Sequence, residues 1–117
     1  MKTYTFSAHE NYITLQINHL QGMPHYNDIT NAIAAHIENG CIYFVIDIAE
    51  LQYIDSVGLS TLITILTKAR NAGGEVVLLQ PAPKVEKMLI VTKLHNLFYV
   101  ATNVAEAVTH FKTESVL

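Results

Sequence analysis

The middle of the chain carries an uninterrupted apolar run, Ile42-Tyr43-Phe44-Val45-Ile46. The run has no polar alternation, which is typical of a strand buried on both faces at the centre of a sheet covered by helices. A short connection over residues 49–54 follows, and then comes Asp55-Ser56-Val57-Gly58. We therefore expect a central strand that leads through this connection into a helix.

The residues after this turn show helical periodicity. Apolar side chains recur at steps of three and four, so they share one face of the predicted helix; they are Leu59, Leu62, Ile63, Leu66 and Ala69. Asp55 and Ser56 both suit the N-cap, because a short side-chain oxygen can accept a hydrogen bond from the free N–H groups of the first turn. The Ser56 hydroxyl is therefore expected at the positive end of a helix, beside a carboxylate.

Length and composition limit the kinds of protein that this chain can be. Its 117 residues suit one domain, 1–117, and half of them are apolar while 15% are charged, as in globular proteins. The net charge is -3 and no cluster of Lys or Arg is present, which argues against a nucleic-acid partner. The single cysteine, Cys41, has no partner for an internal disulfide. With no signal peptide and no apolar run long enough to span a membrane, we expect a cytoplasmic protein.

The N-terminal segments predict two strands and a helix. Apolar residues alternate with polar ones in both strands, and they are Tyr4, Phe6 and Ala8, then Ile13, Leu15 and Ile17. A loop over residues 19–27, with Gly22 and Pro24, precedes a helix capped by Asn27 or Asp28 whose inward face is Ile29, Ala32, Ile33 and Ile37. Gly40 is placed to end this helix in a left-handed conformation.

The C-terminal half continues the alternation of helices and strands. Gly73-Gly74 ends the central helix, and residues 75–79 form another buried-type strand. A helix from Pro83 should face inward with Val85, Met88 and Leu89, a short strand should cover 97–101, and a last helix should use Val104, Ala107, Val108 and Phe111. This order predicts an α/β fold with one small mixed sheet of four or five strands and helices packed mainly on one side. Ser56 then lies on the rim where such folds bind ligands.

Ser56 has two interpretations. Ser56 either caps the helix and has no further role, or it accepts a phosphate group. A phosphate there would meet first-turn N–H groups that favour an anion, and it would add about -1.5 to -2 charge beside Asp55, Glu50 and Asp47. The helix would tolerate the phosphate while a bound partner would be repelled, so binding would switch without unfolding. Gly58, without a side chain, would allow a partner to approach closely.

Catalytic and metal sites have weaker support. A nucleophile elbow requires Gly-x-Ser-x-Gly, but Ile54 stands at the first position. None of the six histidines pairs with another at i,i+4, and no second cysteine accompanies Cys41, so we expect no metal and no cofactor. The segment Met23-Pro24-His25-Tyr26 is rich in apolar and aromatic residues. It either packs onto the sheet edge or contacts a partner.

With these residues considered together, the chain resembles STAS domain proteins of the anti-sigma factor antagonist family over nearly its whole length. The resemblance rests on segments spread along the chain: Val45-Ile46-Asp47-Ile48, Tyr53-Ile54-Asp55-Ser56-Val57-Gly58-Leu59, Gly73-Gly74-Glu75-Val76-Val77-Leu78 and Leu94-His95-Asn96-Leu97-Phe98. It implies the STAS fold, a small mixed sheet with helices on one side, and a function as a binding protein rather than an enzyme.

The resemblance also implies partners and a modification. In the family, the serine directly after the aspartate is phosphorylated by an anti-sigma factor with serine-kinase activity, and that serine is Ser56 here. The dephosphorylated form binds the anti-sigma factor and frees the sigma factor, and a metal-dependent serine phosphatase resets the switch. Asp55 is then the acid beside the phosphosite, and Asp47, Val57, Gly58 and Gly22 are expected near the bound partner. Whether the free protein forms a homodimer is left open.

Three departures from the family pattern affect these expectations. Val57 replaces a second Ser or Thr, so Ser56 is the sole acceptor of the motif. The segment His19-Leu20-Gln21-Gly22 lacks the family's acid near the phosphosite, which leaves the partner's identity open. Thr92-Lys93-Leu94 replaces Ser/Thr-Gly-Leu at a helix end. An alternative function within the same fold is an accessory subunit of a phospholipid-type membrane transporter, which would bind the transporter ATPase constitutively.

Overall fold

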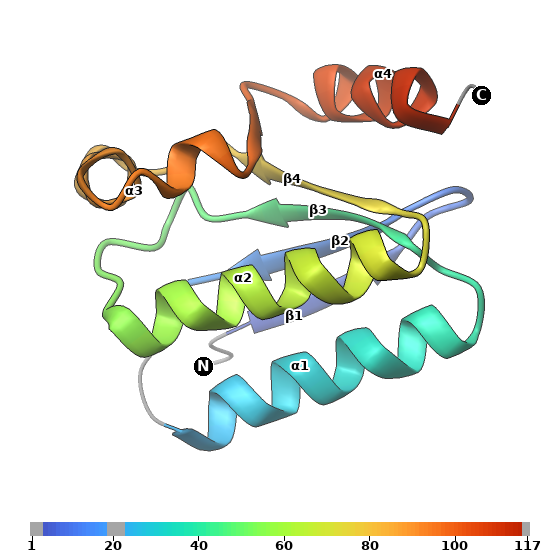
Figure 1. Ribbon diagram of the computed structural model, residues 1–117, viewed down its shortest axis with the longest axis horizontal. Helices are drawn as coiled ribbons and strands as arrows, with labels where there is room; N and C mark the ends of the chain where they lie inside the picture. Colours follow the sequence, from blue (N-terminus) through green and yellow to red (C-terminus); the bar gives the residue numbers. More distant parts are fainter. Residues whose placement is uncertain (1–3, 19–22, 116–117) are drawn as a thin grey trace.

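A computed structural model describes residues 4–18 and 23–115 of the chain (Figure 1). The elements follow in the order β1 (Tyr4–Ala8), β2 (Ile13–Ile17), α1 (Met23–Glu38), β3 (Tyr43–Asp47), α2 (Ser56–Asn71), β4 (Glu75–Leu79), α3 (Pro83–Val91), the short 3-10 helix η1 (Leu94–Asn96), β5 (Tyr99–Ala101) and α4 (Val104–Ser115). The predicted order of helices and strands is confirmed throughout.

The strands form one mixed sheet in which sequence neighbours lie side by side, in the order β1-β2-β3-β4-β5. β1 and β2 form an antiparallel hairpin, while β2, β3, β4 and β5 run parallel. Phe44 pairs with Ile13 on one side and with Val76 on the other. The apolar run around Phe44 therefore forms the central strand, as its lack of polar alternation predicted.

Helices cover both faces of this sheet unequally. On one face, Phe44 and Ile46 of β3 join a large core with side chains of α1, α2 and α3. On the other, Val45 packs with Ala107 and Phe111 of α4 in a smaller core. Figure 1 shows α1 and α2 on the opposite side of the sheet from α4, and α3 at the end toward which β3 points. The expected arrangement, with helices mainly on one side, is confirmed.

Three local predictions were wrong. Helix α1 begins at Met23, not after a loop reaching residue 27, because Pro24 is tolerated in a first helical turn. Met88 and Val104 were assigned to inner faces, but 39% of Met88 and 37% of Val104 is exposed. On α3 the inner face is carried by Val85 and Leu89 alone. The last strand begins at Tyr99, because Leu97 and Phe98 form a turn that follows η1.

Backbone geometry explains the presence of glycine at two positions in the fold. Gly40 has a φ of 91°, so the predicted left-handed end of the first helix is confirmed. Gly74 lies against the start of β3, and a Cβ added there would come within 1.8 Å of the Ile42 carbonyl oxygen. Close approach of the two backbones therefore requires glycine at the turn between α2 and β4.

Candidate functional site

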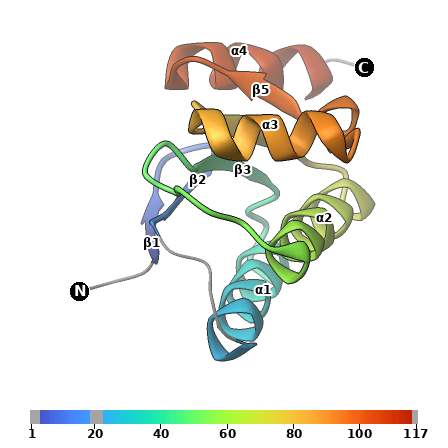
Figure 2. The same cartoon turned by 90° about the vertical axis from the view of Figure 1, so that its left-hand side faces the viewer.

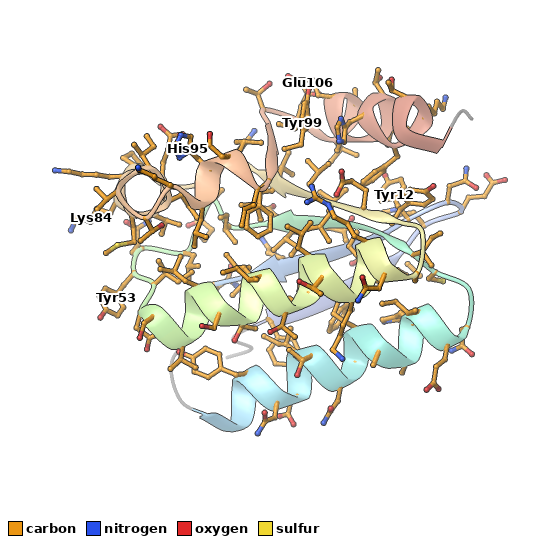
Figure 3. All side chains as sticks on the ribbon, in the orientation of Figure 1. Tyr12, Tyr53, Lys84, His95, Tyr99 and Glu106 are labelled. Carbon is orange, nitrogen blue, oxygen red and sulfur yellow. The ribbon has the colours of Figure 1, made fainter. Side chains whose placement is uncertain are left out.

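The connection from β3 to α2 is held by three buried side chains. Ile48, Leu51 and Ile54 are 0%, 1% and 3% exposed, respectively, and all belong to the large core. They alternate with exposed residues, which include Tyr53 at 58% exposure. Figure 3 shows Tyr53 at the end of the molecule where α2 begins. The apolar anchors therefore place the first turn of α2 on the rim of the sheet, as the sequence predicted.

Asp55 is the N-cap of α2, and it has the extended backbone typical of that position, with φ -99° and ψ -179°. Its Oδ1 accepts a hydrogen bond of 2.7 Å from the Gly58 N–H. Its carbonyl oxygen accepts a bond of 2.9 Å from the Leu59 N–H. Of the two cap candidates, Asp55 thus occupies the cap and Ser56 is the first residue of the helix.

A second helix holds the same carboxylate. The Tyr26 hydroxyl, from the first turn of α1, lies 2.9 Å from Oδ1 and 3.1 Å from Oδ2 of Asp55. Tyr26 is 4% exposed. Burial, the hydrogen bond to Asp55 and electrostatic interactions with Asp55 and Tyr53 raise the pKa of Tyr26 to about 12. The phenol therefore stays protonated at neutral pH and serves as a donor to Asp55.

Sequence reasoning did not find this role of Tyr26. It placed Tyr26 in a loop segment that would either pack on the sheet edge or contact a partner. The two bonded residues are 29 positions apart, so no local spacing could pair them. The available signal was a single aromatic residue carrying a polar group just ahead of an amphipathic helix.

Ser56 and Val57 lie on the outer side of this first turn. Ser56 is exposed, and its hydroxyl makes no hydrogen bond within the part of the chain that the structure describes. The backbone N–H groups of Ser56 and Val57 also lack an acceptor among residues 4–18 and 23–115, as expected for the first residues of a helix. The structure therefore brings together an accessible hydroxyl and two amides that can stabilise an anion.

The other predicted site residues differ from Ser56 in their exposure and contacts. Val57 is 39% exposed beside Ser56, whereas Gly58 is buried in the same turn. Asp47 ends β3, and its Oδ1 accepts a hydrogen bond of 3.1 Å from the Ala49 N–H, so its carboxylate stabilises the turn that leaves the strand. Gly22 lies outside the described residues.

Apolar side chains are exposed at the same end of the molecule. Tyr53 and Val57 flank the first turn of α2, and the outer side of α3 exposes Met88, Ile90 and Val91. Figure 2 shows α3 lying alongside the β3–α2 connection. Contiguous exposed apolar surface is typical of sites that bind other proteins, so this end of the molecule is a candidate contact surface. We call the surface formed by Tyr53, Ser56 and Val57 the α2 rim.

Within the described residues, no group of three His, Cys, Asp or Glu side chains is arranged to hold a metal ion. No histidine among them is hydrogen-bonded to Ser56, and the imidazoles of His95 and His110 contact Leu89 and Glu75 instead. In the same part of the chain, no helix is long and apolar enough to cross a membrane.

Comparison with known proteins gives a consistent result. Residues 10–107 match the profile of the STAS domain family. BtrV of Bordetella bronchiseptica, whose name describes a proposed anti-sigma factor antagonist, is 31% identical over 81 residues, which cover 69% of this chain and 70% of BtrV.

Solved structures share the fold at lower identity. The protein TM1081 of Thermotoga maritima is similar with a TM-score of 0.86 at 18% identity, covering 96% of this chain and 90% of TM1081. The anti-sigma factor antagonist SpoIIAA of Bacillus in its unphosphorylated form gives 0.79 at 18% identity, covering 94% and 96% of the two chains. Its phosphorylated form gives 0.70 at 19% identity, covering 92% and 97%.

Proposed function

We propose a function from one premise, which is that the chain belongs to the STAS domain family. Within that family it is an anti-sigma factor antagonist whose binding is switched by phosphorylation of Ser56. The unphosphorylated protein binds an anti-sigma factor through the α2 rim, and the phosphorylated protein does not. It acts as a substrate and a binding partner rather than as an enzyme.

The observation that carries this proposal is the position of the Ser56 hydroxyl. It is exposed at the first turn of α2, directly after a cap whose carboxylate is held by the Gly58 N–H and the Tyr26 hydroxyl. Because Asp55 already caps the helix, Ser56 is not needed as a cap, which removes the main reason to assign it a purely structural role. Its hydroxyl is accessible to a kinase.

The electrostatics of the first turn favour a switch of binding over a change of fold. A phosphate on Ser56 would lie near the free amides of Ser56 and Val57 and at the positive end of a helix of 16 residues. It would also stand beside the Asp55 carboxylate and add about -1.5 to -2 charge. The helix end offsets much of that repulsion within the protein, whereas a bound partner would have to bury the new charge.

The α2 rim also explains why unphosphorylated protein would bind. Tyr53 and Val57, which precede and follow Ser56 in the chain, are 58% and 39% exposed. Burying them against an apolar patch of a partner would contribute about 25 cal/mol per Å². A phosphate on Ser56, with a charge of about -1.5 to -2, would have to be desolvated for the same contact to form. The exposed apolar surfaces of Tyr53 and Val57 therefore make partner binding at the α2 rim sensitive to a charge on Ser56.

The partners follow from this chemistry and from the family. The anti-sigma factor is a serine kinase that transfers the γ-phosphate of ATP to the Ser56 hydroxyl, and a metal-dependent serine phosphatase removes it by hydrolysis. The name of BtrV supports the first partner. The existence of SpoIIAA in phosphorylated and unphosphorylated forms supports the modification.

The test incubates the protein with its cognate kinase and ATP, and locates phosphate by mass spectrometry. We expect the label on Ser56, with none on Ser56→Ala and full labelling of Ser60→Ala, which alters an exposed serine one turn further along α2. Binding of the kinase should persist in Ser56→Ala and weaken at least about tenfold in Ser56→Asp. Equal binding of both variants, or capture of a transporter ATPase instead of a kinase, would contradict the proposal.

A further inference from the structure

A cavity of about 390 Å³ lies at the opposite end of the molecule from the α2 rim. It is bounded by the turn between β1 and β2, by the connection from α1 to β3, and by the last turns of α4. Figure 3 shows Tyr12, which lines this cavity, at the far end of the sheet from Tyr53. Its volume falls within the range of pockets that bind small molecules.

Aromatic side chains form the walls of this cavity, and three separate segments supply them. Phe111 of α4 lies with its ring centre 5.1 Å from that of Tyr43 and 6.4 Å from that of Tyr12. The ring planes are tilted by 46° and 41° in these two pairs. A planar ring stacked on Phe111 would therefore meet the rings of Tyr43 and Tyr12 at a tilt of about 45°, between the stacked and edge-on arrangements of aromatic pairs.

The ring of Tyr12, which forms one wall of the cavity, is held in place by the ring of His9. His9 stacks on Tyr12 with ring centres 4.5 Å apart and planes 16° apart, and the His9 N–H donates a hydrogen bond of 2.9 Å to the Tyr12 carbonyl oxygen. Tyr12 and Tyr43 both pack against the smaller core. These contacts hold the ring of Tyr12 in place before any ligand arrives, and so lower the entropic cost of binding.

The lining of the cavity also contains exposed polar side chains, including Lys112 of α4. Glu10 and Asn11, in the β1–β2 turn, are exposed and belong to its lining. Together they offer carboxylate and amide oxygens as acceptors and an amide NH₂ group as a donor. Apolar aromatic walls combined with a few polar groups are characteristic of small-molecule sites.

We propose that this cavity binds a planar aromatic small molecule that carries a hydrogen-bonding group on one edge. The rings of Tyr12, Tyr43 and Phe111 contact its faces, and Glu10 and Asn11 meet its polar edge. The site uses no residue of the α2 rim and does not depend on the proposed function. If Ser56 is never phosphorylated, the cavity should bind the same compounds.

Two compounds with one carbon skeleton test the aromatic requirement. 2-Naphthol is planar, uncharged at neutral pH and carries one hydroxyl, while decahydro-2-naphthol has the same skeleton and hydroxyl without the aromatic rings. Because the chain contains no tryptophan, the fluorescence of 2-naphthol can be followed with little interference from the protein. We expect 2-naphthol to bind about tenfold more tightly than the saturated alcohol. Equal affinities, or no binding of either compound at millimolar concentration, would overturn the proposal.

Two phenylalanine substitutions on α4 locate the binding. Val108 lines the cavity, so Val108→Phe should fill part of it and weaken 2-naphthol binding at least about tenfold. Val104→Phe makes the same change one turn earlier at a residue that is 37% exposed and away from the lining, and it should leave the affinity within about twofold.

A further variant and an NMR mapping experiment distinguish a specific loss of binding from a loss of the fold. Phe111→Leu keeps an apolar side chain, so the ratio between the affinities for 2-naphthol and its saturated analogue should fall toward one. In amide NMR spectra of the wild type, shifts caused by 2-naphthol should cluster at residues 9–12, 40–43 and 108–112. Shifts confined to residues 53–58, or unchanged binding in folded Val108→Phe, would show that the cavity is not the site.

Discussion

The Tyr26 hydroxyl donates a hydrogen bond of 2.9 Å to Oδ1 of Asp55, the same oxygen that accepts from the Gly58 N–H at 2.7 Å. One carboxylate therefore joins the first turn of α1 to the first turn of α2. Because Ser56 follows Asp55 directly, this bond also sets the direction in which the proposed phosphoacceptor faces. The contact between the two helices thus positions the site and contributes to stability.

Tyr26→Phe removes the donor to Asp55 and keeps the buried ring. We expect the free energy of unfolding to fall by about 1–2 kcal/mol, as for the loss of a buried hydrogen bond to a charged group. Urea denaturation followed by circular dichroism measures the change. Tyr53→Phe is the matched control, since this tyrosine is 58% exposed, and it should stay within about 0.5 kcal/mol of the wild type. A similar loss in both variants would contradict this role of Tyr26.

The raised pKa of Tyr26, about 12 in the folded protein against 10.0 ordinarily, predicts a dependence of stability on alkaline pH. The folded state holds this proton more tightly than the unfolded chain, so the stabilisation is complete below pH 10 and is lost as the pH rises from 10 toward 12. The free energy of unfolding should fall more steeply over this interval in the wild type than in Tyr26→Phe. Parallel curves for the two proteins would argue against the shift.

Asp55 should tolerate asparagine but not alanine. Asparagine keeps an oxygen for the Gly58 N–H and the Tyr26 hydroxyl, so we expect a loss under about 1 kcal/mol. Alanine removes the cap and leaves a buried phenol without its acceptor, so the loss should be about 2–3 kcal/mol. Thermal unfolding of the two variants beside the wild type measures the difference. A drop of equal size in both would mean that charge matters more than hydrogen bonding.

Ser56→Asp should change binding while leaving the fold intact. A negative charge in the first helical turn interacts favourably with the helix dipole by about 0.3–1 kcal/mol, and repulsion from Asp55 opposes it. The net effect on the free energy of unfolding should be within about 0.5 kcal/mol, as measured by urea denaturation. A Ser56→Asp variant that is much less stable than Ser56→Ala would imply that phosphate acts by unfolding the rim.

Gly74→Ala should be the most damaging of the single substitutions at the turn after α2. Its Cβ would lie 1.8 Å from the Ile42 carbonyl oxygen, a backbone atom directly before the central strand that cannot move aside, so we expect a loss of roughly 3 kcal/mol or more. The neighbouring Gly73→Ala meets nothing within 4 Å but has a φ of 91°, which costs about 1–2 kcal/mol. Thermal denaturation should rank the two variants in this order, and the reverse ranking would be inconsistent with the close approach.

The strand after that turn begins with a buried carboxylate. Glu75 is 7% exposed and contacts Arg70 Nε at 2.9 Å and His110 Nε2 at 3.4 Å, so it links α2 and α4 to the sheet. Glu75→Ala should lower the free energy of unfolding by about 1–3 kcal/mol, because it removes the buried carboxylate that contacts both basic side chains. Glu50→Ala, at an exposed turn position, should change it by less than about 0.5 kcal/mol.

Local sequence was sufficient to predict the order of helices and strands and the position of Ser56. Alternating and helical periodicities depend on which residues share a face, and that is a property of each segment alone. The unbroken apolar run that predicts β3 and the short polar side chains that predict the cap before α2 are also local properties. Met88 was misplaced because a helix can carry apolar residues on a face that no neighbour covers.

Only the tertiary structure decided which distant residues meet. Tyr26 and Asp55 are 29 positions apart, and the walls of the aromatic cavity come from the β1–β2 turn, β3 and α4. Such contacts depend on how complete elements pack, and many sequence patterns are compatible with each packing. The sequence by itself therefore located the hydroxyl at the start of α2. The fold alone determined that the adjoining carboxylate is held from a second helix, because a hydrogen bond between helices exists only once both have docked.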